Sequence, residues 1–140
     1  PLNADADPGQ FYRAAAKSSR PIGVILMDQA AISGVGNIFR AESLYRQKID
    51  PLRPGKTLSD DELRRLWDDN KHLLTIGVRV GRIITTEQQD RPGIPETEAW
   101  PDHANYVYMR HGQKCPRCSA TIRMEEIAGR KLYWCPGCQK

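Results

Sequence analysis

Cysteine is absent from the first 114 residues of this 140-residue chain, and long hydrophobic runs are absent throughout. The longest run, Ile22 to Met27, has six residues and includes Gly23, whereas a membrane-spanning helix needs roughly 20. The opening residues, Pro1 to Asp7, are acidic and lack the apolar stretch of a secretory signal. We therefore expect a cytoplasmic protein with no membrane span.

Common catalytic patterns are missing as well. The sequence shows no Ser/His/Asp set, no glycine-rich phosphate loop of the nucleotide-hydrolase type and no metal-hydrolase helix motif. Adjacent acids occur at Asp60-Asp61, Asp68-Asp69 and Glu125-Glu126. Because neighbours on a helix do not face each other, we expect the first two pairs to face solvent. Asp28-Gln29 is interpreted as part of a corner between helices, so we predict no catalytic residue in this chain.

The net charge of +4 is unevenly distributed. Residues 1–100 contain 14 Lys/Arg and 14 Asp/Glu, so their charges cancel. Residues 101–140 contain 7 Lys/Arg and 3 Asp/Glu, so the whole excess lies in the last forty residues. Concentrated positive charge favours a polyanionic partner, and nucleic acid is the commonest one. A solvated basic tail is the alternative.

The four cysteines form two pairs in the same basic region, Cys115-Pro-Arg-Cys118 and Cys135-Pro-Gly-Cys138. Two such pairs at this separation are typical of a four-thiolate zinc site. Each pair forms a tight turn, or knuckle, that places two sulfurs side by side, and two knuckles complete a tetrahedron. We therefore predict one structural Zn²⁺, which supplies much of the folding energy of this short region.

Two other readings of the cysteines remain open at this point. An iron–tetrathiolate site uses the same ligand set, and two disulfides are possible in an exported protein. His103 and His111 lie near the cluster, but four thiolates already fill a structural site, so both are interpreted as surface histidines. His72 lies in a predicted helix and is interpreted as structural.

Hydrophobic periodicity predicts four helices before the cysteines. The first covers residues 7–19, with Asp7 as its N-cap and Pro8 in its first turn. The second covers 22–31, and the third begins at Ile38 and ends before Asp50. The fourth begins at a capping box, Ser59 to Glu62, and runs to about residue 84.

The rest of the chain is predicted as a loop and a hairpin. Residues 85–104 show no sustained period and are interpreted as a linker. Residues 121–126 and 131–134 read as two strands joined at Ala128-Gly129. We therefore expect a mainly α fold with a small β-hairpin zinc finger. Its domains are a helical unit over 1–100 and a zinc finger over 105–140, which pack together.

A glycine-rich corner, Gly34-Val35-Gly36-Asn37, lies between the second and third predicted helices. The N-terminus of a helix offers unpaired amides and the positive end of its dipole, which suits a phosphate. Glycines permit close approach and unusual backbone conformations, and the Asn37 amide can donate to a phosphate oxygen. Alternatively, Asn37 only caps the helix and the glycines only form a tight turn.

A second candidate is Gly129-Arg130-Lys131 at the predicted hairpin tip. An arginine on a metal-anchored hairpin can bind a phosphate with its forked guanidinium. The alternative is a solvated hairpin tip.

These motifs together resemble a known family. The run Asp28-Gln-Ala-Ala-Ile-Ser-Gly-Val-Gly-Asn-Ile-Phe-Arg-Ala-Glu42, followed by Ile49-Asp-Pro51, resembles the helix–two-turns–helix element of the formamidopyrimidine-DNA glycosylase/endonuclease VIII family. The run from Tyr106 to Cys118, then Gly129-Arg130 and the run from Trp134 to Gln139, resembles the zinc finger of that family. The resemblance covers nearly the whole chain from about residue 8.

The resemblance implies roles for individual residues. Asn37 matches an asparagine that holds a DNA phosphate near the lesion, with Gly34 and Gly36 in the same corner. Arg130, followed by Lys131, matches the finger arginine that binds phosphate beside the flipped nucleotide. The zinc ligands of the family correspond to Cys115, Cys118, Cys135 and Cys138. The implied partner is damaged double-stranded DNA.

The chain departs from the family at its start. Members begin with a catalytic proline followed by glutamate and then a β-sandwich domain, whereas Leu2 follows Pro1 here and no strand-rich stretch comes next. We therefore expect the monomeric, DNA-binding C-terminal part of an endonuclease VIII-like DNA glycosylase/AP lyase of bacterial base excision repair, associated with the nucleoid. This part alone is expected to be inactive. The alternative is a non-catalytic zinc module that binds DNA or protein.

Overall fold

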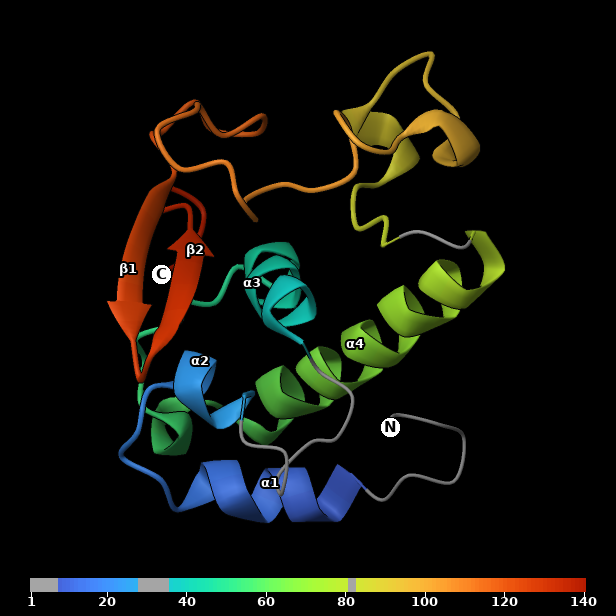
Figure 1. The fold of residues 1–140 in the computed structure, drawn as a ribbon. Helices are drawn as coiled ribbons and strands as arrows, with labels where there is room; N and C mark the ends of the chain where they lie inside the picture. The colour runs from blue at the N-terminus through green and yellow to red at the C-terminus, as the bar shows by residue number, and fades with distance from the viewer. Residues whose placement is uncertain (1–7, 28–35, 81–82) are drawn as a thin grey trace.

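The computed structural model describes residues 8–27, 36–80 and 83–140 (Figure 1). Within these ranges the chain forms α1 (Pro8–Ala16), α2 (Ile22–Ile25), α3 (Asn37–Arg46) and α4 (Asp60–Val80), followed by the strands β1 (Arg123–Ile127) and β2 (Arg130–Trp134). Short 3₁₀ turns occur at η1 (Gly55–Thr57), η2 (Gln88–Asp90) and η3 (Glu96–Glu98). The predicted class, mainly α with a small β-hairpin, is confirmed.

Helix α4 begins at the predicted capping box. The Ser59 amide donates to Glu62 Oε1 at 2.9 Å, and the Glu62 amide donates to Ser59 Oγ at 3.1 Å. The predicted end near residue 84 is wrong, because residues 83–86 are not helical. There the amides of Thr85 and Thr86 donate to the carbonyl oxygen of Ala104 at 2.8 and 3.2 Å. Residues 85 and 86 are therefore held against a distant segment of the chain.

The other helices are shorter than the periodicity predicts. The first ends at Ala16 rather than 19, and Asp7 lies outside the described residues. The helix predicted over 22–31 is described only as the four-residue α2, followed by a turn at Leu26 and Met27. Its remaining residues, with Asp28-Gln29 and Gly34, lie outside the described ranges.

Apolar residues from all four helices form the helical core. Phe11 from α1, Leu44 from α3 and Leu66 from α4 are fully buried in it. The rings of Phe11 and Trp67 stack with centroids 6.1 Å apart. No helix in the described part of the chain is long and apolar enough to cross a membrane.

The two strands pair antiparallel with Glu126 opposite Lys131 and Ile127 opposite Arg130. The two-residue turn between them has φ values of 53° at Ala128 and 76° at Gly129. Positive φ at both positions is the signature of a type I′ turn, which matches the twist of a hairpin. The predicted tip is therefore confirmed, and it presents the exposed Arg130 at the start of β2.

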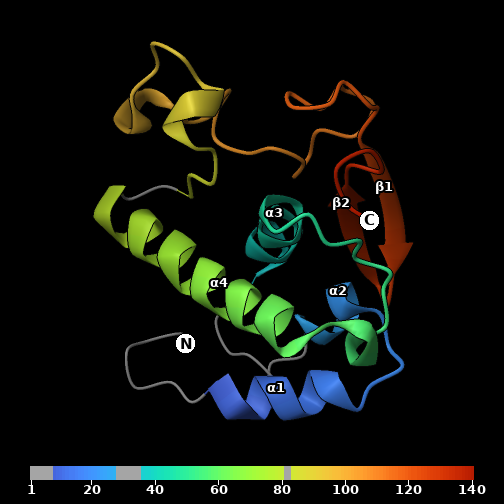
Figure 2. The same ribbon diagram turned by 180° about the vertical axis from the view of Figure 1, so that it is seen from behind.

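Helix α3 lies between α4 and the hairpin, as both views show (Figures 1 and 2). One side of α3 contributes Phe39 and Leu44 to the helical core. Another contributes Ala41 and Tyr45 to a second cluster with finger residues such as Tyr133. The helices and the finger therefore pack on a shared element, while the division into domains at residues 100–105 stays a prediction.

A buried carboxylate on α3 fixes the entry to the finger. The Glu42 side chain is fully buried and accepts hydrogen bonds from the amides of Tyr106, Val107 and Tyr108 at 2.6, 2.7 and 2.9 Å. It also accepts a hydrogen bond from the Thr85 hydroxyl. Burial raises the pKa of Glu42, and these four donors oppose that rise by stabilising the carboxylate.

Candidate metal centre and nucleic-acid interface

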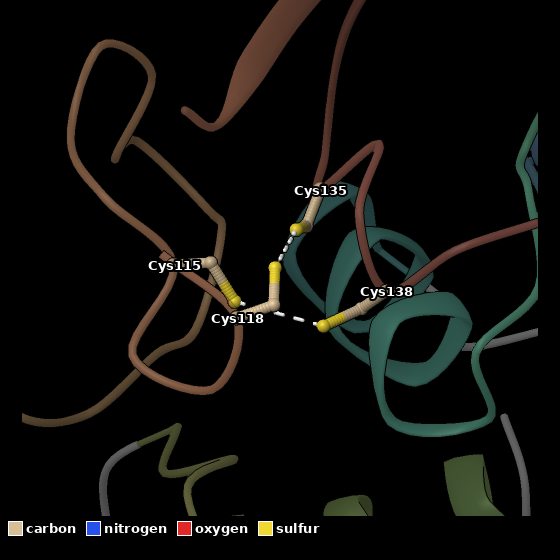
Figure 3. Close-up of side chains that lie close together, drawn as sticks. All are labelled: Cys115, Cys118, Cys135 and Cys138. Carbon is tan, nitrogen blue, oxygen red and sulfur yellow. Dashed lines mark hydrogen bonds between the residues drawn. The ribbon is translucent and has the colours of Figure 1, made fainter. Parts of the chain in front are cut away.

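The four cysteine sulfurs converge on one point between the two knuckles (Figure 3). The sulfurs of Cys115 and Cys138 are 3.7 Å apart, those of Cys118 and Cys135 are 3.3 Å apart, and all four lie within 4.8 Å of one another. In a tetrahedron with Zn–S bonds of ~2.3 Å, neighbouring sulfurs are about 3.8 Å apart. The donor set and its geometry therefore fit one tetrahedral Zn²⁺, and the cysteines are not joined as disulfides.

Local hydrogen bonds shape each knuckle. The Cys115 amide donates to Ala120 O at 2.8 Å, and the Gln139 amide donates to Cys135 O at 3.0 Å. At Gly137, a Cβ atom would lie 2.7 Å from the Cys118 sulfur, so a larger residue would collide with the ligand. Proximity to the sulfur, rather than a positive φ, explains the glycine in the second knuckle.

Helix α3 contacts the metal centre directly. The Tyr45 hydroxyl lies 3.1 Å from Cys115 Sγ, and the Arg117 amide donates to the same sulfur at 3.4 Å. Burial raises the pKa of the Cys115 thiol, but these hydrogen bonds outweigh it and lower the pKa to about 7. Since zinc binds the thiolate, these contacts favour the metal-binding form. His103 and His111 are exposed and lie outside the cluster, as predicted, and His72, interpreted as structural, is exposed as well.

The candidate phosphate-binding corner begins at Gly36, the N-cap residue of α3. Its φ of −94° is one that any residue can adopt, so the backbone conformation does not require a glycine at this position. Gly36 is exposed, and no atom of the described residues lies within 4 Å of the position of a Cβ. Its glycine leaves the backbone open to a bulky group from outside.

Asn37 is the first residue of α3 and does not cap the helix with its side chain. Its Oδ1 instead accepts a hydrogen bond from Arg40 Nη2. Because that bond uses the oxygen, the amide nitrogen of Asn37 is the end of the side chain that can donate to a ligand. No described residue accepts a hydrogen bond from it, and Asn37 is half-buried.

Arg40 joins this corner to the finger. Its side chain is buried, with Nη1 donating to Gly23 O and Nη2 to Lys131 O, both at 3.0 Å. Among the described residues, its Nε has no hydrogen-bond partner. Burial, and then the nearby charge of Arg130, lower the pKa of Arg40 to about 10, so the guanidinium stays protonated at neutral pH.

A cavity of about 210 Å³ opens between the helices and the hairpin tip. It is lined by three arginines and three apolar residues: Arg20, Arg40 and Arg130, with Val24, Met27 and Ala128. Several guanidinium groups lining one cavity favour a phosphate-sized anion. The structure therefore brings Arg130 to the same cavity as Arg40, the hydrogen-bond partner of Asn37.

Sequence reasoning missed several residues of this region. Arg40 and Glu42 lie in the run from Asp28 to Glu42 that resembles the helix–two-turns–helix element, but hydrophobic periodicity does not predict that they are buried. The interpretation of Asp69 as solvent-facing is wrong: its side chain is only 7% exposed and accepts hydrogen bonds from Arg46 Nε at 3.0 and 3.1 Å. Asp60 and Asp61 are exposed, as expected.

Comparison with known proteins places these features in a family. A family model described as the formamidopyrimidine-DNA glycosylase H2TH domain matches residues 1–89, and one described as a zinc finger found in FPG and IleRS matches residues 112–140. The chain is 42% identical over 140 residues to Endonuclease 8 1 of Mycobacterium tuberculosis, which covers 99% of this chain and 52% of the relative. It is 37% identical over 141 residues to formamidopyrimidine-DNA glycosylase of Thermus thermophilus, covering 97% of this chain and 50% of the relative.

Solved structures give the same family match as the sequence comparisons. The crystal structure of MutM (Fpg) from Thermus thermophilus matches 99% of this chain with a TM-score of 0.78 and 34% identity, over 52% of its own chain. A complex between Lactococcus lactis Fpg and DNA containing an abasic site matches 100% of this chain with a TM-score of 0.79 and 28% identity, over 50% of that protein. The present chain thus spans about half the length of the relatives it matches. The four cysteines form the structural zinc site of the finger, and the chain belongs to the formamidopyrimidine-DNA glycosylase/endonuclease VIII family, of which it carries the C-terminal region.

Proposed function

We propose that this chain is the DNA-binding part of a bifunctional DNA glycosylase/AP lyase that removes oxidised bases during base excision repair. The observation that carries the proposal is the arginine-lined cavity beside Asn37, on a fold whose relatives include an Fpg bound to abasic DNA. A phosphate in this cavity would lie against Arg130 and Arg40, with the Asn37 amide nitrogen as a neutral donor.

The proposed contacts position the DNA and do not read its bases. Phosphate contacts fix where a protein lies on a duplex but carry no sequence information. Arg130 supplies a charge from the hairpin tip, Asn37 supplies a donor from α3, and the exposed Lys131 adds a second charge. Zinc, held by Cys115, Cys118, Cys135 and Cys138, supplies the rigidity of the finger. The zinc takes no part in the chemistry that we propose.

The chemistry itself belongs to the rest of the parent protein in this proposal. The family resemblance assigns base removal and strand cleavage to an N-terminal proline on a β-sandwich domain. The chain described here would bind duplex DNA as a monomer in the cytoplasm, at the bacterial nucleoid. Alone, it would form no covalent adduct with abasic DNA in the presence of borohydride, a reagent that traps a Schiff base between an amine and the sugar.

Binding to a duplex that contains an abasic-site analogue tests the proposal. Arg130→Ala should weaken binding and lower the slope of log affinity against log salt by about 1, because one phosphate charge contact is lost. Asn37→Ala should weaken binding with the slope unchanged, because the lost donor is neutral. Arg64→Ala is the control, since Arg64 is exposed on α4 and paired with Asp61.

Three outcomes count against the proposal. Affinity that does not change between about 50 and 200 mM salt would exclude a phosphate-dominated interface. Equal loss in the Arg64→Ala control would show that any removed cation weakens binding. A borohydride-trapped adduct with this chain alone would place the nucleophile inside it.

A further inference from the structure

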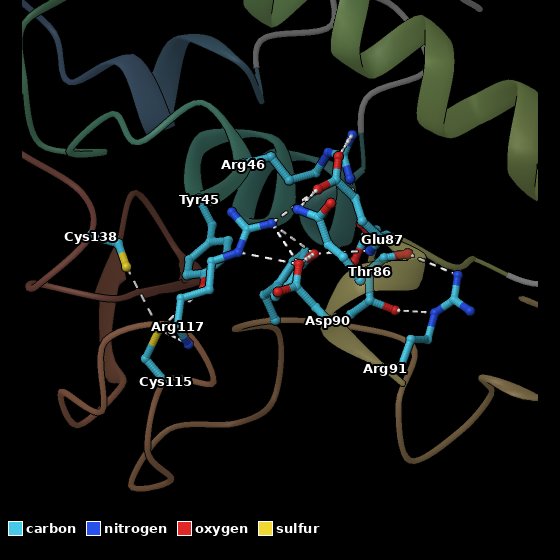
Figure 4. Close-up of polar contacts among 12 residues, drawn as sticks. Tyr45, Arg46, Thr86, Glu87, Asp90, Arg91, Cys115, Arg117 and Cys138 are labelled. Carbon is cyan, nitrogen blue, oxygen red and sulfur yellow. Dashed lines mark hydrogen bonds and ion pairs between the residues drawn. The ribbon is translucent and has the colours of Figure 1, made fainter. Parts of the chain in front are cut away.

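Arg117 occupies an unusual place in the finger, inside the first zinc knuckle and between the ligands Cys115 and Cys118. Its side chain points away from the metal toward the loop that follows α4 (Figure 4). Arg117 Nη2 lies 2.7 Å from Asp90 Oδ2 and 3.2 Å from Glu87 Oε2. The same nitrogen donates to the Tyr106 hydroxyl at 3.0 Å.

Two tyrosine rings support the guanidinium from one side. Arg117 Cζ lies 4.6 Å from the centroid of the Tyr106 ring and 5.4 Å from that of the Tyr45 ring, and the two rings stack 4.6 Å apart. Such cation–π contacts gain strength when the cation is partly desolvated, and the Arg117 side chain is 24% exposed. The ion pairs therefore form on an ordered platform, unlike a typical surface salt bridge.

Several hydrogen bonds attach the segment 85–91 to the rest of the protein, among them those of the Thr85 and Thr86 amides to Ala104 O and that of the Glu87 amide to the Tyr106 hydroxyl at 2.9 Å. Arg46 on α3 donates to Thr85 O at 2.7 Å and lies 3.7 Å from Glu87. The buried Arg91 donates to Thr86 Oγ1 at 3.0 Å and to Gln88 Oε1 at 2.9 Å, so these bonds organise the segment from within. From the finger, the charged contact with this segment is that of Arg117.

We propose that Arg117 is a positioning residue through which the zinc-bound knuckle fixes the segment 87–90. Zinc holds Cys115 and Cys118 and thereby sets the backbone between them, which carries Arg117. When the knuckle opens, the guanidinium leaves the tyrosine platform, and the Asp90 carboxylate loses its charged partner and keeps only the hydrogen bond from the Tyr106 hydroxyl among those described. Because coupling between two sites is reciprocal, weakening the contact from the loop side also weakens the hold on zinc.

Hydrogen exchange on the zinc-loaded chain tests the first half of this coupling. Arg117→Gln removes the positive charge of the ion pair without altering a zinc ligand. Asp90→Asn removes the negative charge on the loop and leaves the sequence of the knuckle unchanged. Arg123→Gln, exposed on β1, is the matched control. We expect amides of residues 86–91 to exchange at least about 5-fold faster in both variants, the lower end of typical coupling between sites.

Zinc release to a chromophoric chelator tests the reciprocal half. Asp90→Asn should release zinc at least about 5-fold faster than the unaltered chain, although position 90 is 25 residues from the first ligand. A purely local role of Asp90 would leave that rate unchanged. If the Arg117→Gln variant does not retain zinc, the exchange and zinc-release rates of Asp90→Asn alone test the proposal.

Unchanged exchange at 86–91 and an unchanged release rate in Asp90→Asn overturn the proposal. Faster exchange and faster zinc release in the Arg123→Gln control also overturn the proposal, because they would show that the loss of any positive charge in the finger has this effect. Neither measurement uses DNA, so the result is independent of the proposed function.

Discussion

Arg40 Nη2 donates to the carbonyl oxygen of Lys131 at 3.0 Å, across a separation of 91 residues. The same nitrogen binds Asn37 Oδ1, so one buried guanidinium fixes the first turn of α3 relative to the hairpin tip. The distance between Asn37 and Arg130 is therefore set by a hydrogen-bonded group and not by two independent domains. A rigid arrangement of donors binds a phosphodiester with a smaller loss of conformational entropy.

Replacing Arg40 with lysine tests this arrangement. A lysine keeps the charge, but its single nitrogen cannot reproduce the fork that reaches Gly23, Asn37 and Lys131. We expect a loss of about 1.5–3 kcal/mol in the free energy of unfolding, and weaker binding to abasic duplex DNA with an unchanged salt slope. Denaturant titration and anisotropy measure the two effects.

Arg64→Lys serves as the control for Arg40→Lys, because Arg64 is exposed on α4. Full stability and affinity in Arg40→Lys would show that charge alone suffices. In that case the geometry of the fork would have no part in holding the two elements together.

Glu42→Gln should destabilise the fold more than an ordinary isosteric change. The new amide nitrogen would face backbone N–H groups that now donate to a carboxylate oxygen, leaving at least one buried donor without an acceptor. Loss of a hydrogen bond to a charged group, with a buried donor left unsatisfied, costs about 3 kcal/mol or more. Thermal unfolding of the zinc-loaded chain checks this, with Glu125→Gln on the exposed face of β1 as control. Equal melting temperatures would contradict the role assigned to Glu42.

The sequence was sufficient to predict features that depend on neighbouring residues. The capping box at Ser59, the turn at Gly129 and the two cysteine knuckles each need only a short run of residue types. All three are present in the structure. The predicted roles of Asn37 and Arg130 came from a resemblance to a family, and they stay predictions until binding is measured.

Features that depend on distant partners could not be predicted. The burial of Asp69 requires Arg46, which comes from another helix. The position of residues 85 and 86 depends on Ala104, whose carbonyl oxygen accepts hydrogen bonds from both of their amides. Glu42 reads as a polar residue on a helix, and only the folded path of residues 106–108 explains why its charge is buried.

Removal of zinc should unfold the finger and spare most of the helical core. The core around Phe11, Leu44 and Leu66 contains no residue of the finger, whereas the hairpin has two short strands and depends on the metal. We expect chelation to open tryptic sites at Arg123 and Arg130 while most of the helical circular dichroism remains. Zinc, but not magnesium, should restore protection, since thiolates select the softer ion. Complete loss of helicity would show that the helices cannot fold without the finger.

The ion pair between Arg53 and Glu62 predicts a dependence of stability on acid pH. Arg53 Nη1 lies 2.8 Å from Glu62 Oε2, and hydrogen bonds from Arg53 lower the pKa of Glu62, against a smaller opposing effect of burial. A carboxyl whose pKa is lowered by folding takes up its proton more readily in the unfolded chain. Its contribution is therefore complete above the ordinary glutamate pKa of about 4.3 and is lost as pH falls through the lower pKa of the folded state.

The free energy of unfolding should therefore depend less on pH in the acid range in Glu62→Gln than in the unaltered chain. Glutamine can still complete the capping box with Ser59, so the variant removes the titrating charge and keeps the cap. The unaltered chain should be more stable than Glu62→Gln at pH 6, and the difference should shrink toward zero on acidification below about 4. Circular dichroism during denaturant titration measures this on both proteins, and because zinc loss in acid affects both alike, their difference isolates Glu62. Asp68→Asn, a change at an exposed position on the same helix, is the control. If the difference in stability between the unaltered chain and Glu62→Gln stays constant with pH, the Arg53 contact does not depend on the charge of Glu62.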